Sequence, residues 1–172
     1  MRTKERRPVK PIEPQVEALL MKMSLHEKVL LLSGKDVWKT HPIDHLDIQS
    51  VVMTDGPHGV RASHPEMGRI VGPTTCFPTG VAMGASWDPE LIEKVGEALG
   101  EETTAMGCDV LLGPCINIVR GPLGGRNFET YSEDPYLTSR LAVAYVRGVQ
   151  SQGVATSIKH FACNNQEIER FR

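Results

Sequence analysis

The chain has 172 residues, of which 40% are hydrophobic and 23% charged, which is enough for one globular domain with a hydrophobic core. Its formal net charge of −2 at pH 7 excludes a general electrostatic attraction to nucleic acid or to an anionic membrane. No run of residues reaches the about 18–20 apolar positions that span a bilayer, so we expect no nucleic-acid partner and no membrane span.

The basic N-terminal segment, residues 1–10, is expected to be a solvated leader, because Glu5 and Pro8 interrupt its positive charges. No apolar stretch follows it, so it lacks the pattern of a secretory signal. The 4 cysteines include no closely spaced pair of the kind that holds structural zinc, and free thiols are typical of a reducing cytoplasm. We therefore expect a cytoplasmic protein that needs neither a metal nor a cofactor.

The first regular elements are expected between residues 13 and 32, where apolar residues recur at helical spacing in two pieces. Ser24 and Glu27 have the spacing of a capping box, in which each side chain accepts a hydrogen bond from the other residue's backbone N–H. The second helix should therefore begin after Ser24, and Gly34 is expected to end it.

Four short apolar runs further along predict strands, namely residues 50–54, 80–84, 109–112 and 154–158, the second being the weakest. Runs that are apolar on both faces suit parallel strands buried on both sides. Two long helices should begin at Asp88-Pro89 and at Asp134-Pro135, because each pair places a capping residue before a proline. Strands that alternate with helices predict an α/β fold with a parallel sheet.

Polar side chains gather where these strands end, in and beside two long loops, 58–78 and 113–133. The carboxyl ends of parallel strands are where α/β folds place their sites. Arginine and lysine donate hydrogen bonds, aspartate accepts them, and histidine does either, which suits a neutral ligand rich in hydroxyl groups, such as a sugar ring. The candidate residues are Asp55, Arg61, Arg126, Asn127, Glu129, Lys159 and His160.

Each candidate also has a structural interpretation. Arg126 and Glu129 could form an ion pair that braces their loop. Asp55, before Gly-Pro, could be a turn residue bonded to its own backbone, and Lys159 could extend into solvent from a strand end. The clustering at successive strand ends favours the functional interpretation. The glycine-rich segment 121–126 lacks the Gly-Lys-Ser/Thr ending of a phosphate-binding loop, and four of the histidines (His41, His45, His58 and His64) have no regular ligand spacing.

Five ordered motifs in this chain resemble those of glycoside hydrolase family 3, of the β-glucosidase type. They are MTDGPHGVR at 53–61, FP at 77–78 leading to SWDP at 86–89, LLGP at 111–114, GRNFETYSEDP at 125–135 and KHF at 159–161. The similarity runs from about Ser24 to the last residue. The resemblance favours a β-glucosidase over the family's N-acetylglucosaminidases, because residues 161–167 lack their histidine-bearing Pro-Gly-His-Gly loop.

The resemblance implies a (β/α)8 barrel, of the TIM type, followed by an α/β sandwich domain. This chain would supply the N-terminal half of the barrel, with about four parallel strands and their covering helices. Residues 1–23 would be a leader and first helix, and residues 24–172 an incomplete barrel domain. The family also often has cis peptide bonds around the segment that corresponds to Lys159-His160-Phe161.

The resemblance further implies the release of non-reducing-end β-D-glucosyl residues, in carbohydrate catabolism, by double displacement between two carboxyl groups about 5–5.5 Å apart. The family's nucleophile and its general acid/base both come from later segments, so no catalytic residue is expected in this chain. We expect the chain to be inactive by itself and to need the missing C-terminal part of the enzyme. The residues expected to hold the −1 sugar of a β-glucoside or oligosaccharide are Asp55, Arg61, Arg126, Lys159 and His160.

Two other interpretations of the sequence stay open. The chain could be a non-catalytic carbohydrate-binding module that uses the same loops. It could also be one subunit of a split β-glucosidase or β-xylosidase, completed by a second polypeptide that carries the nucleophile.

Overall fold

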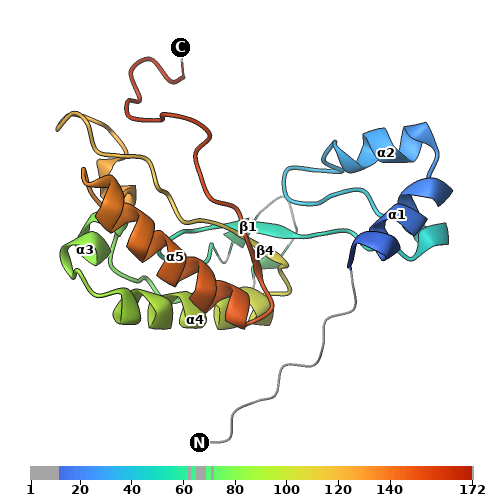
Figure 1. The fold of residues 1–172 in the computed structure, drawn as a ribbon, viewed down its shortest axis with the longest axis horizontal. Coiled ribbons are helices and arrows are strands. Elements are labelled where there is room, and N and C mark those ends of the chain that lie inside the picture. Colours follow the sequence, from blue (N-terminus) through green and yellow to red (C-terminus); the bar gives the residue numbers. More distant parts are fainter. Residues whose placement is uncertain (1–11, 62, 65–68, 71, 172) are drawn as a thin grey trace, which may run out of the picture. The chain divides into compact units, whose positions relative to one another are not determined.

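The computed structural model describes residues 12–61, 63–64, 69–70 and 72–171 (Figure 1). The chain divides into two compact units, Met1–Ser50 and Val51–Arg172. The predicted leader, residues 1–10, lies outside the described residues.

The first unit contains α1 (Ile12–Lys22), α2 (Leu25–Leu31) and the 3-10 helix η1 (Asp44–Leu46). The predicted capping box is confirmed, because Ser24 Oγ accepts from the Glu27 N–H at 3.3 Å and Glu27 Oε2 accepts from the Ser24 N–H at 2.7 Å. Helix α2 already ends at Leu31, and Leu32 is its C-cap, so Gly34 is not the residue that ends it.

The second unit is built on a parallel sheet of β1 (Met53–Asp55), β4 (Val110–Leu112) and β5 (Ala155–Thr156), in the order β1-β4-β5. Thr54 lies beside Leu111, which lies beside Thr156, and both Thr54 and Leu111 are completely buried. Three of the four predicted strands are therefore confirmed. β5 lies at the edge of the described sheet and is only partly buried, contrary to the expectation of burial on both faces.

The fourth predicted strand, residues 80–84, is wrong, because this segment is helix α3 (Gly80–Ala85). Gly80 and Gly84 are one helical turn apart, so they share a face of the helix. That face packs directly on backbone: a Cβ built at Gly80 would lie 2.3 Å from the carbonyl oxygen of Glu129, and one at Gly84 would lie 2.0 Å from that of Tyr131. The parallel sheet of the described residues thus has three strands instead of about four.

The expected loop 58–78 contains two very short strands that the sequence did not predict. They are β2 (Ser63–His64) and β3 (Arg69–Ile70), which pair antiparallel.

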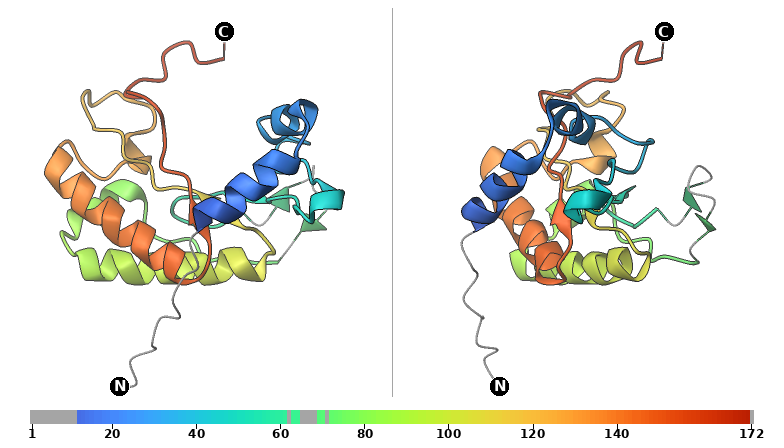
Figure 2. Two further views of the ribbon diagram at one scale, coloured as in Figure 1. Left: turned by 45° about the vertical axis from the view of Figure 1, so that its right-hand side comes forward. Right: turned by 90° about the vertical axis from the view of Figure 1, so that its right-hand side faces the viewer.

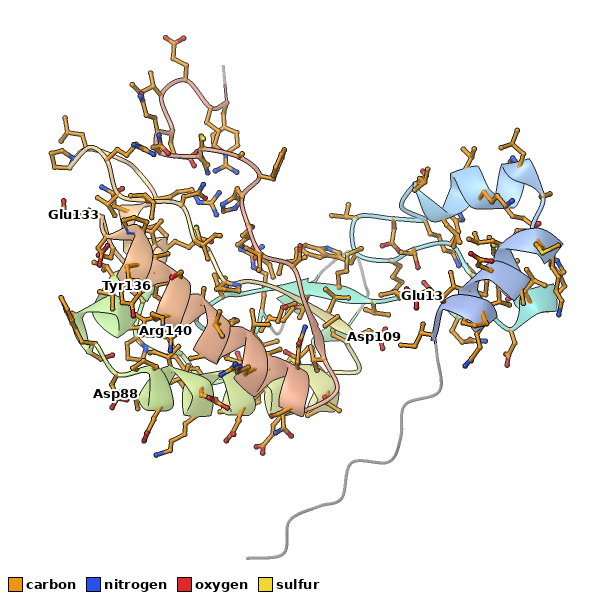
Figure 3. The ribbon with its side chains drawn as sticks, viewed as in Figure 1. Glu13, Asp88, Asp109, Glu133, Tyr136 and Arg140 are labelled. Carbon is orange, nitrogen blue, oxygen red and sulfur yellow. The ribbon has the colours of Figure 1, made fainter. Side chains whose placement is uncertain are left out.

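Both long helices begin where the sequence predicts. α4 (Pro89–Ala105) is capped by Asp88, whose Oδ1 accepts from the backbone N–H of Glu90 at 3.0 Å, and Figure 3 shows Asp88 at this end of the helix. α5 (Pro135–Ser151) is capped in the same way by Asp134, which accepts from the Tyr136 and Leu137 N–H groups. A proline in the first turn removes a backbone donor that has no partner within the helix.

Helices α4 and α5 lie side by side in Figures 1 and 2 and approach closely at two glycines. A Cβ at Gly96 would lie 2.6 Å from the Tyr145 carbonyl oxygen, and one at Gly148 would lie 2.1 Å from that of Glu93. The hydrophobic core of the second unit gathers around this contact and the sheet. Its fully buried members include Ile92, Leu99, Leu111, Leu141, Tyr145 and Val149.

The second unit is thus an α/β fold whose strands alternate with helices. In the described part of the chain, no helix is both long enough and apolar enough to cross a membrane.

Candidate functional site

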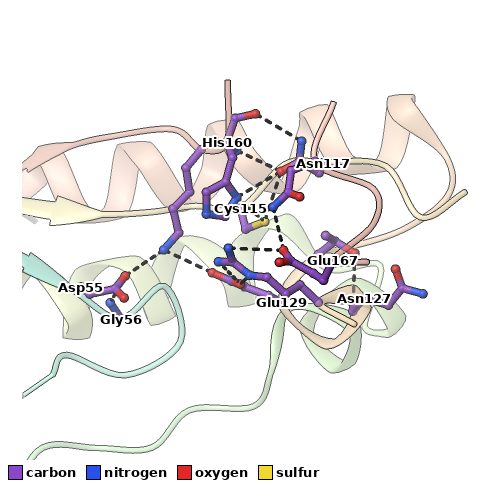
Figure 4. A network of polar contacts seen from close by, with 12 residues as sticks. Asp55, Gly56, Cys115, Asn117, Asn127, Glu129, His160 and Glu167 are labelled. Carbon is purple, nitrogen blue, oxygen red and sulfur yellow. Dashed lines mark hydrogen bonds and ion pairs between the residues drawn. The ribbon is translucent and has the colours of Figure 1, made fainter. Parts of the chain in front are cut away.

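The candidate site lies at the carboxyl ends of the three parallel strands. Asp55 is the last residue of β1. Beyond β4 and β5 the segments that follow the two strands continue to pair. Cys115 bridges Lys159 in parallel register, and the Ile116 N–H donates to the Lys159 carbonyl at 2.9 Å. This register brings the segment after β4 beside Lys159 and His160, and the side chain of Lys159 extends to Asp55 (Figure 4).

Lys159 connects two carboxylates that come from different elements, Asp55 at the end of β1 and Glu129 in the loop after β4. Its Nζ lies 2.8 Å from Asp55 Oδ1 and 3.2 Å from Glu129 Oε1. The side chain of Lys159 is 14% exposed and that of Glu129 only 6%. The alternative interpretation of Lys159 as a solvated side chain is therefore wrong, because its ammonium group is held between two acceptors.

Glu129 is also paired with Arg126. Its Oε2 accepts from Arg126 Nε at 2.6 Å and forms an ion pair with a terminal nitrogen of the same guanidinium. This is the predicted loop-bracing ion pair, but the same carboxylate also reaches Lys159. Arg126 further approaches Glu167, whose Oε1 lies 3.8 Å from Nη1. Charges thus alternate along a chain of four groups, Asp55, Lys159, Glu129 and Arg126, in which every cation has a carboxylate partner.

The position of Glu129 depends on local packing. It ends the 3-10 helix η3 (Asn127–Glu129), and its carbonyl group lies against Gly80 of α3. Because the glycine has no side chain, the backbone of residue 129 comes close enough to aim its carboxylate inward. The pairing of Glu129 with Lys159 was not predicted, since nothing in the local sequence links a loop residue to a strand 30 positions later.

Asp55 is held in its ionised form. Burial by itself raises the pKa of this carboxyl, but the hydrogen bond and charge of Lys159, helped by the Gly56 N–H and by Arg61, outweigh burial and place the pKa below its usual range. Asp55 Oδ1 accepts from the Gly56 N–H at 2.9 Å, so the predicted turn interaction exists beside the ion pair. Asp55 is therefore a hydrogen-bond acceptor at neutral pH.

Arg61 returns to the same strand end. Its backbone N–H donates to the Asp55 carbonyl oxygen at 3.0 Å, and its side chain is exposed. A hollow of about 420 Å³ opens here, and the candidates Asp55, Arg61 and Arg126 all line it together with Glu129 and Phe128. The structure thus brings three of the five predicted sugar-holding residues around one hollow, and Lys159 is bonded to its wall.

His160 lies on the other side of Lys159, against the segment that follows β4. Its backbone and its ring both contact the side chain of Asn117, and its Nδ1 is 3.7 Å from Cys115 Sγ. The peptide bonds Lys159–His160 and Phe161–Ala162 are cis, as the resemblance implies, and Gly113–Pro114 is cis as well.

Three residues of the site escaped the sequence interpretation. His58 lines the hollow, its ring meets Phe128 edge to face at 6.0 Å, and burial lowers its pKa. Asn117 is buried beside His160, and Glu167 reaches Arg126 from the segment after Lys159. Asn117 follows a predicted strand by only a few residues, which is the signal that could have identified it.

A second hollow, of about 590 Å³, lies between residues 120–125, which include most of the glycine-rich segment, and residues 165–168. Glu167 lines it and also contacts Arg126, so this hollow adjoins the charged cluster. Within the described ranges, no group of three or more histidine, cysteine or acidic side chains is placed to hold a metal ion.

Comparisons with known proteins agree on one family. Residues 19–168 match the model of the glycosyl hydrolase family 3 N-terminal domain. The chain is 51% identical over 160 residues to the thermostable beta-glucosidase B of Acetivibrio thermocellus, a match that covers 90% of this chain and 21% of that protein. It is 49% identical over 156 residues to an exo-alpha-(1->6)-L-arabinopyranosidase of Bifidobacterium longum, covering 87% of this chain and 20% of that one.

A solved structure gives the same result. The beta-glucosidase 3B of Thermotoga neapolitana, in complex with alpha-D-glucose, superposes with a TM-score of 0.81 at 41% identity, over 89% of this chain and 24% of that one. The chain therefore spans about a fifth of the length of the curated relatives it matches, at 21% and 20%.

Proposed function

Because this chain belongs to glycosyl hydrolase family 3, we propose that it supplies the sugar-holding part of a β-glucosidase-type active site. The observation that carries the proposal is Lys159, held between Asp55 and Glu129 at the carboxyl ends of the parallel strands. A sugar ring would take hydrogen bonds from Lys159, Arg61 and Arg126. It would donate hydroxyl hydrogens to Asp55, with His160 as a further partner.

The electrostatics favour holding the sugar over cleaving it. A glycosidase needs a carboxylic acid with a raised pKa to protonate the leaving group. Asp55 has a lowered pKa, and so has Glu167, through its hydrogen bond with Arg170. Glu129 is bonded to two cations. We therefore propose that the nucleophile and the acid/base belong to the part of a full-length family 3 enzyme that lies outside this chain. We also propose that this chain alone does not hydrolyse glycosides.

The proposed architecture follows from the same relatives. Residues 24–172 would be the first part of a (β/α)8 barrel, with the three strands β1, β4 and β5 adjacent in its wall. Three observations support this proposal. The strands are parallel, the candidate site lies at their carboxyl ends as in barrel enzymes, and the superposition on the Thermotoga neapolitana enzyme has a TM-score of 0.81. The partners would be a β-glucoside or oligosaccharide and the rest of the enzyme, with no nucleic acid, membrane or cofactor.

A hybrid enzyme tests the proposed function. In it, the segment of this chain that matches the Acetivibrio thermocellus thermostable beta-glucosidase B, which is 90% of the chain, replaces its counterpart in that protein. We expect the hybrid to hydrolyse an aryl β-glucoside and its Asp55→Asn variant to lose at least tenfold in kcat/KM. An active hybrid in which Asp55→Asn and Lys159→Met change nothing would contradict the proposed site.

The 172-residue chain by itself provides the second measurement. We expect calorimetric titration with methyl β-D-glucoside to detect binding that Lys159→Met abolishes, and we expect no release of nitrophenol from an aryl β-glucoside. Binding without activity in either protein would favour a carbohydrate-binding module. Activity restored by adding a separately expressed remainder of the relative would favour a split enzyme.

The sugar itself has a second candidate. A relative named as an arabinopyranosidase is almost as similar to this chain as one named as a beta-glucosidase, at 49% against 51% identity. The hybrid should therefore be assayed in parallel on aryl β-glucoside, β-xyloside and α-L-arabinopyranoside. We expect the glucoside to have the highest kcat/KM, and a preference for either pentoside would replace glucose as the proposed sugar.

A further inference from the structure

The side chain of Asn117 contacts His160 at three points. Its Oδ1 lies 2.9 Å from the His160 backbone nitrogen and 3.2 Å from ring Nδ1, and its Nδ2 lies 3.3 Å from the His160 carbonyl oxygen. Asn117 is 8% exposed, so water does not compete freely for these groups. Figure 4 shows the amide lying against both the backbone and the ring of His160.

The two backbone contacts determine which way the amide points. A backbone N–H is always a donor and a carbonyl always an acceptor, so Oδ1 must face the N–H and Nδ2 must face the carbonyl. The reverse orientation would place two donors against each other and two acceptors against each other. The orientation of Asn117 therefore follows from groups whose hydrogen-bonding roles do not vary.

This orientation in turn determines the tautomer of the ring. Oδ1 has lone pairs and no hydrogen, so Nδ1 at 3.2 Å is attracted to it only when Nδ1 carries a proton. Cys115 does not change this conclusion. Its Sγ is 3.7 Å from Nδ1 and from Oδ1, and burial raises the pKa of the thiol, which keeps it protonated and a weak partner.

The surroundings of His160 favour the neutral ring. Burial lowers its pKa, and the charges of Arg126, Lys159 and Arg170 lower it further, while the charge of Glu129 raises it without reversing the shift. A neutral ring with its proton on Nδ1 has an unprotonated Nε2, which can only accept.

We propose that Asn117 is a positioning residue that holds His160 in the Nδ1–H tautomer, so that Nε2 accepts a hydrogen bond from a ligand hydroxyl. The proposal rests on the proposed function of the site and deepens it. Lys159 and Arg126 can only donate, whereas Nε2 of His160 can only accept in this tautomer. A hydroxyl that meets Nε2 is therefore recognised by its hydrogen and not by its lone pairs. The site would thus reject a ligand in which fluorine, which cannot donate, replaces that hydroxyl.

The tautomer can be measured without any sugar. The 172-residue chain, labelled with ¹⁵N-histidine, is examined by long-range ¹H–¹⁵N correlation at pH 7.5, and the His160 signals are those missing from His160→Gln. We expect a protonated Nδ1 and an unprotonated Nε2. A proton on Nε2 would overturn the proposal. If the isolated chain gives no dispersed spectrum, the same labelling in the hybrid gives the same readout.

Substitutions of Asn117 separate positioning from general stability. Asn117→Ala removes the acceptor and should abolish the preference for Nδ1–H. Asn117→Asp keeps the acceptor and should preserve the tautomer, while its negative charge raises the titration midpoint of His160. Asn127→Ala is the matched control, because Asn127 donates to the Gly121 carbonyl at 2.8 Å and should leave His160 unchanged. An unchanged tautomer in Asn117→Ala would refute the role of Asn117.

A fluorine scan connects the tautomer to recognition. Each hydroxyl of methyl β-D-glucoside is replaced in turn by fluorine, and inhibition of the hybrid is measured. We expect at least one analogue to bind at least tenfold more weakly than the parent in a way that depends on His160, so that His160→Ala removes most of that difference, whereas a loss caused by Asp55 should persist in His160→Ala. A sugar that does not bind, together with the expected tautomer, would refute the proposed function and leave the positioning role intact. Binding with equal loss in both proteins for every analogue would refute acceptance by Nε2.

Discussion

Lys159 Nζ lies 2.8 Å from Asp55 Oδ1, although 104 residues separate the two in the sequence. The contact joins the end of β1 to the segment after β5, although the two strands are not neighbours, because β4 lies between them in the sheet. The lysine side chain is long enough to extend across the position of β4. Its ammonium group then pairs with the shorter side chains of Asp55 and Glu129. Lys159 therefore links the end of β1, the segment after β5 and the loop that carries Glu129 and Arg126.

Removing the cation should change the titration of Asp55. In Lys159→Met, burial is no longer opposed by the lysine, so the pKa of Asp55 should rise above its value in the parent chain. Carboxyl ¹³C shifts recorded against pH measure this change. Lys94→Met, which removes an exposed lysine of α4, is the control and should leave Asp55 unchanged.

The same contact predicts how stability depends on pH. Since the pKa of Asp55 is lower in the folded than in the unfolded chain, the unfolded chain binds more protons as acid is added. The stabilisation is complete above the unfolded pKa of about 3.9 and is lost as the pH falls through the lower folded value. Urea unfolding between pH 6 and pH 2 should show a smaller loss of free energy of unfolding over this window in Lys159→Met than in the parent. An equal loss in both proteins would argue against the contact.

Glu129 is expected to matter more than a nearby acidic residue of the same loop. Glu129→Gln removes the negative charge and replaces one of the two carboxylate oxygens with an NH2 donor, so either Arg126 or Lys159 then faces a donor in a largely buried position, which should cost about 1–3 kcal/mol of stability. It should also weaken sugar binding by at least tenfold. Glu133→Gln removes the same charge from an exposed position and should change both quantities little. Equal effects of the two substitutions would show that only net charge counts.

The contact between α4 and α5 should not tolerate a methyl group. In Gly148→Ala the new Cβ would lie 2.1 Å from the Glu93 carbonyl oxygen, and a helix backbone cannot rotate away from it as a side chain could. We expect a loss of about 1–3 kcal/mol in urea unfolding. Gly121→Ala, where a Cβ meets nothing within 4 Å, is the control. A Gly148→Ala variant as stable as that control would contradict the close packing.

The start of α5 should depend on its cap. Asp134→Ala removes the acceptor of the Tyr136 and Leu137 N–H groups and should cost about 1 kcal/mol. Asp134→Asn keeps an oxygen acceptor and should recover most of the loss. Thermal unfolding of the parent and the two variants measures the difference. If Asp134→Asn is no more stable than Asp134→Ala, the charge of Asp134, and not its capping hydrogen bonds, stabilises this end of the helix.

The local sequence by itself determined where the main elements begin. Ser24, Asp88 and Asp134 start helices because a short acceptor before a helical run can bond the free N–H groups of its first turn, a relation within three residues. Apolar runs likewise identified the three parallel strands. The motif resemblance identified the family, and the polar residues at the strand ends identified most of the candidate site.

Only the tertiary structure decided what depends on distant partners. Residues 80–84 are small and apolar enough for either a strand or a helix, and the backbone of residues 129–131, packed on Gly80 and Gly84, selects the helix. The pairing of Lys159 with Asp55 and Glu129, and the hold of Asn117 on His160, depend on the register of parallel strands. Register places residues side by side across a sheet, and no periodicity along one segment encodes which residue of another segment lies opposite it.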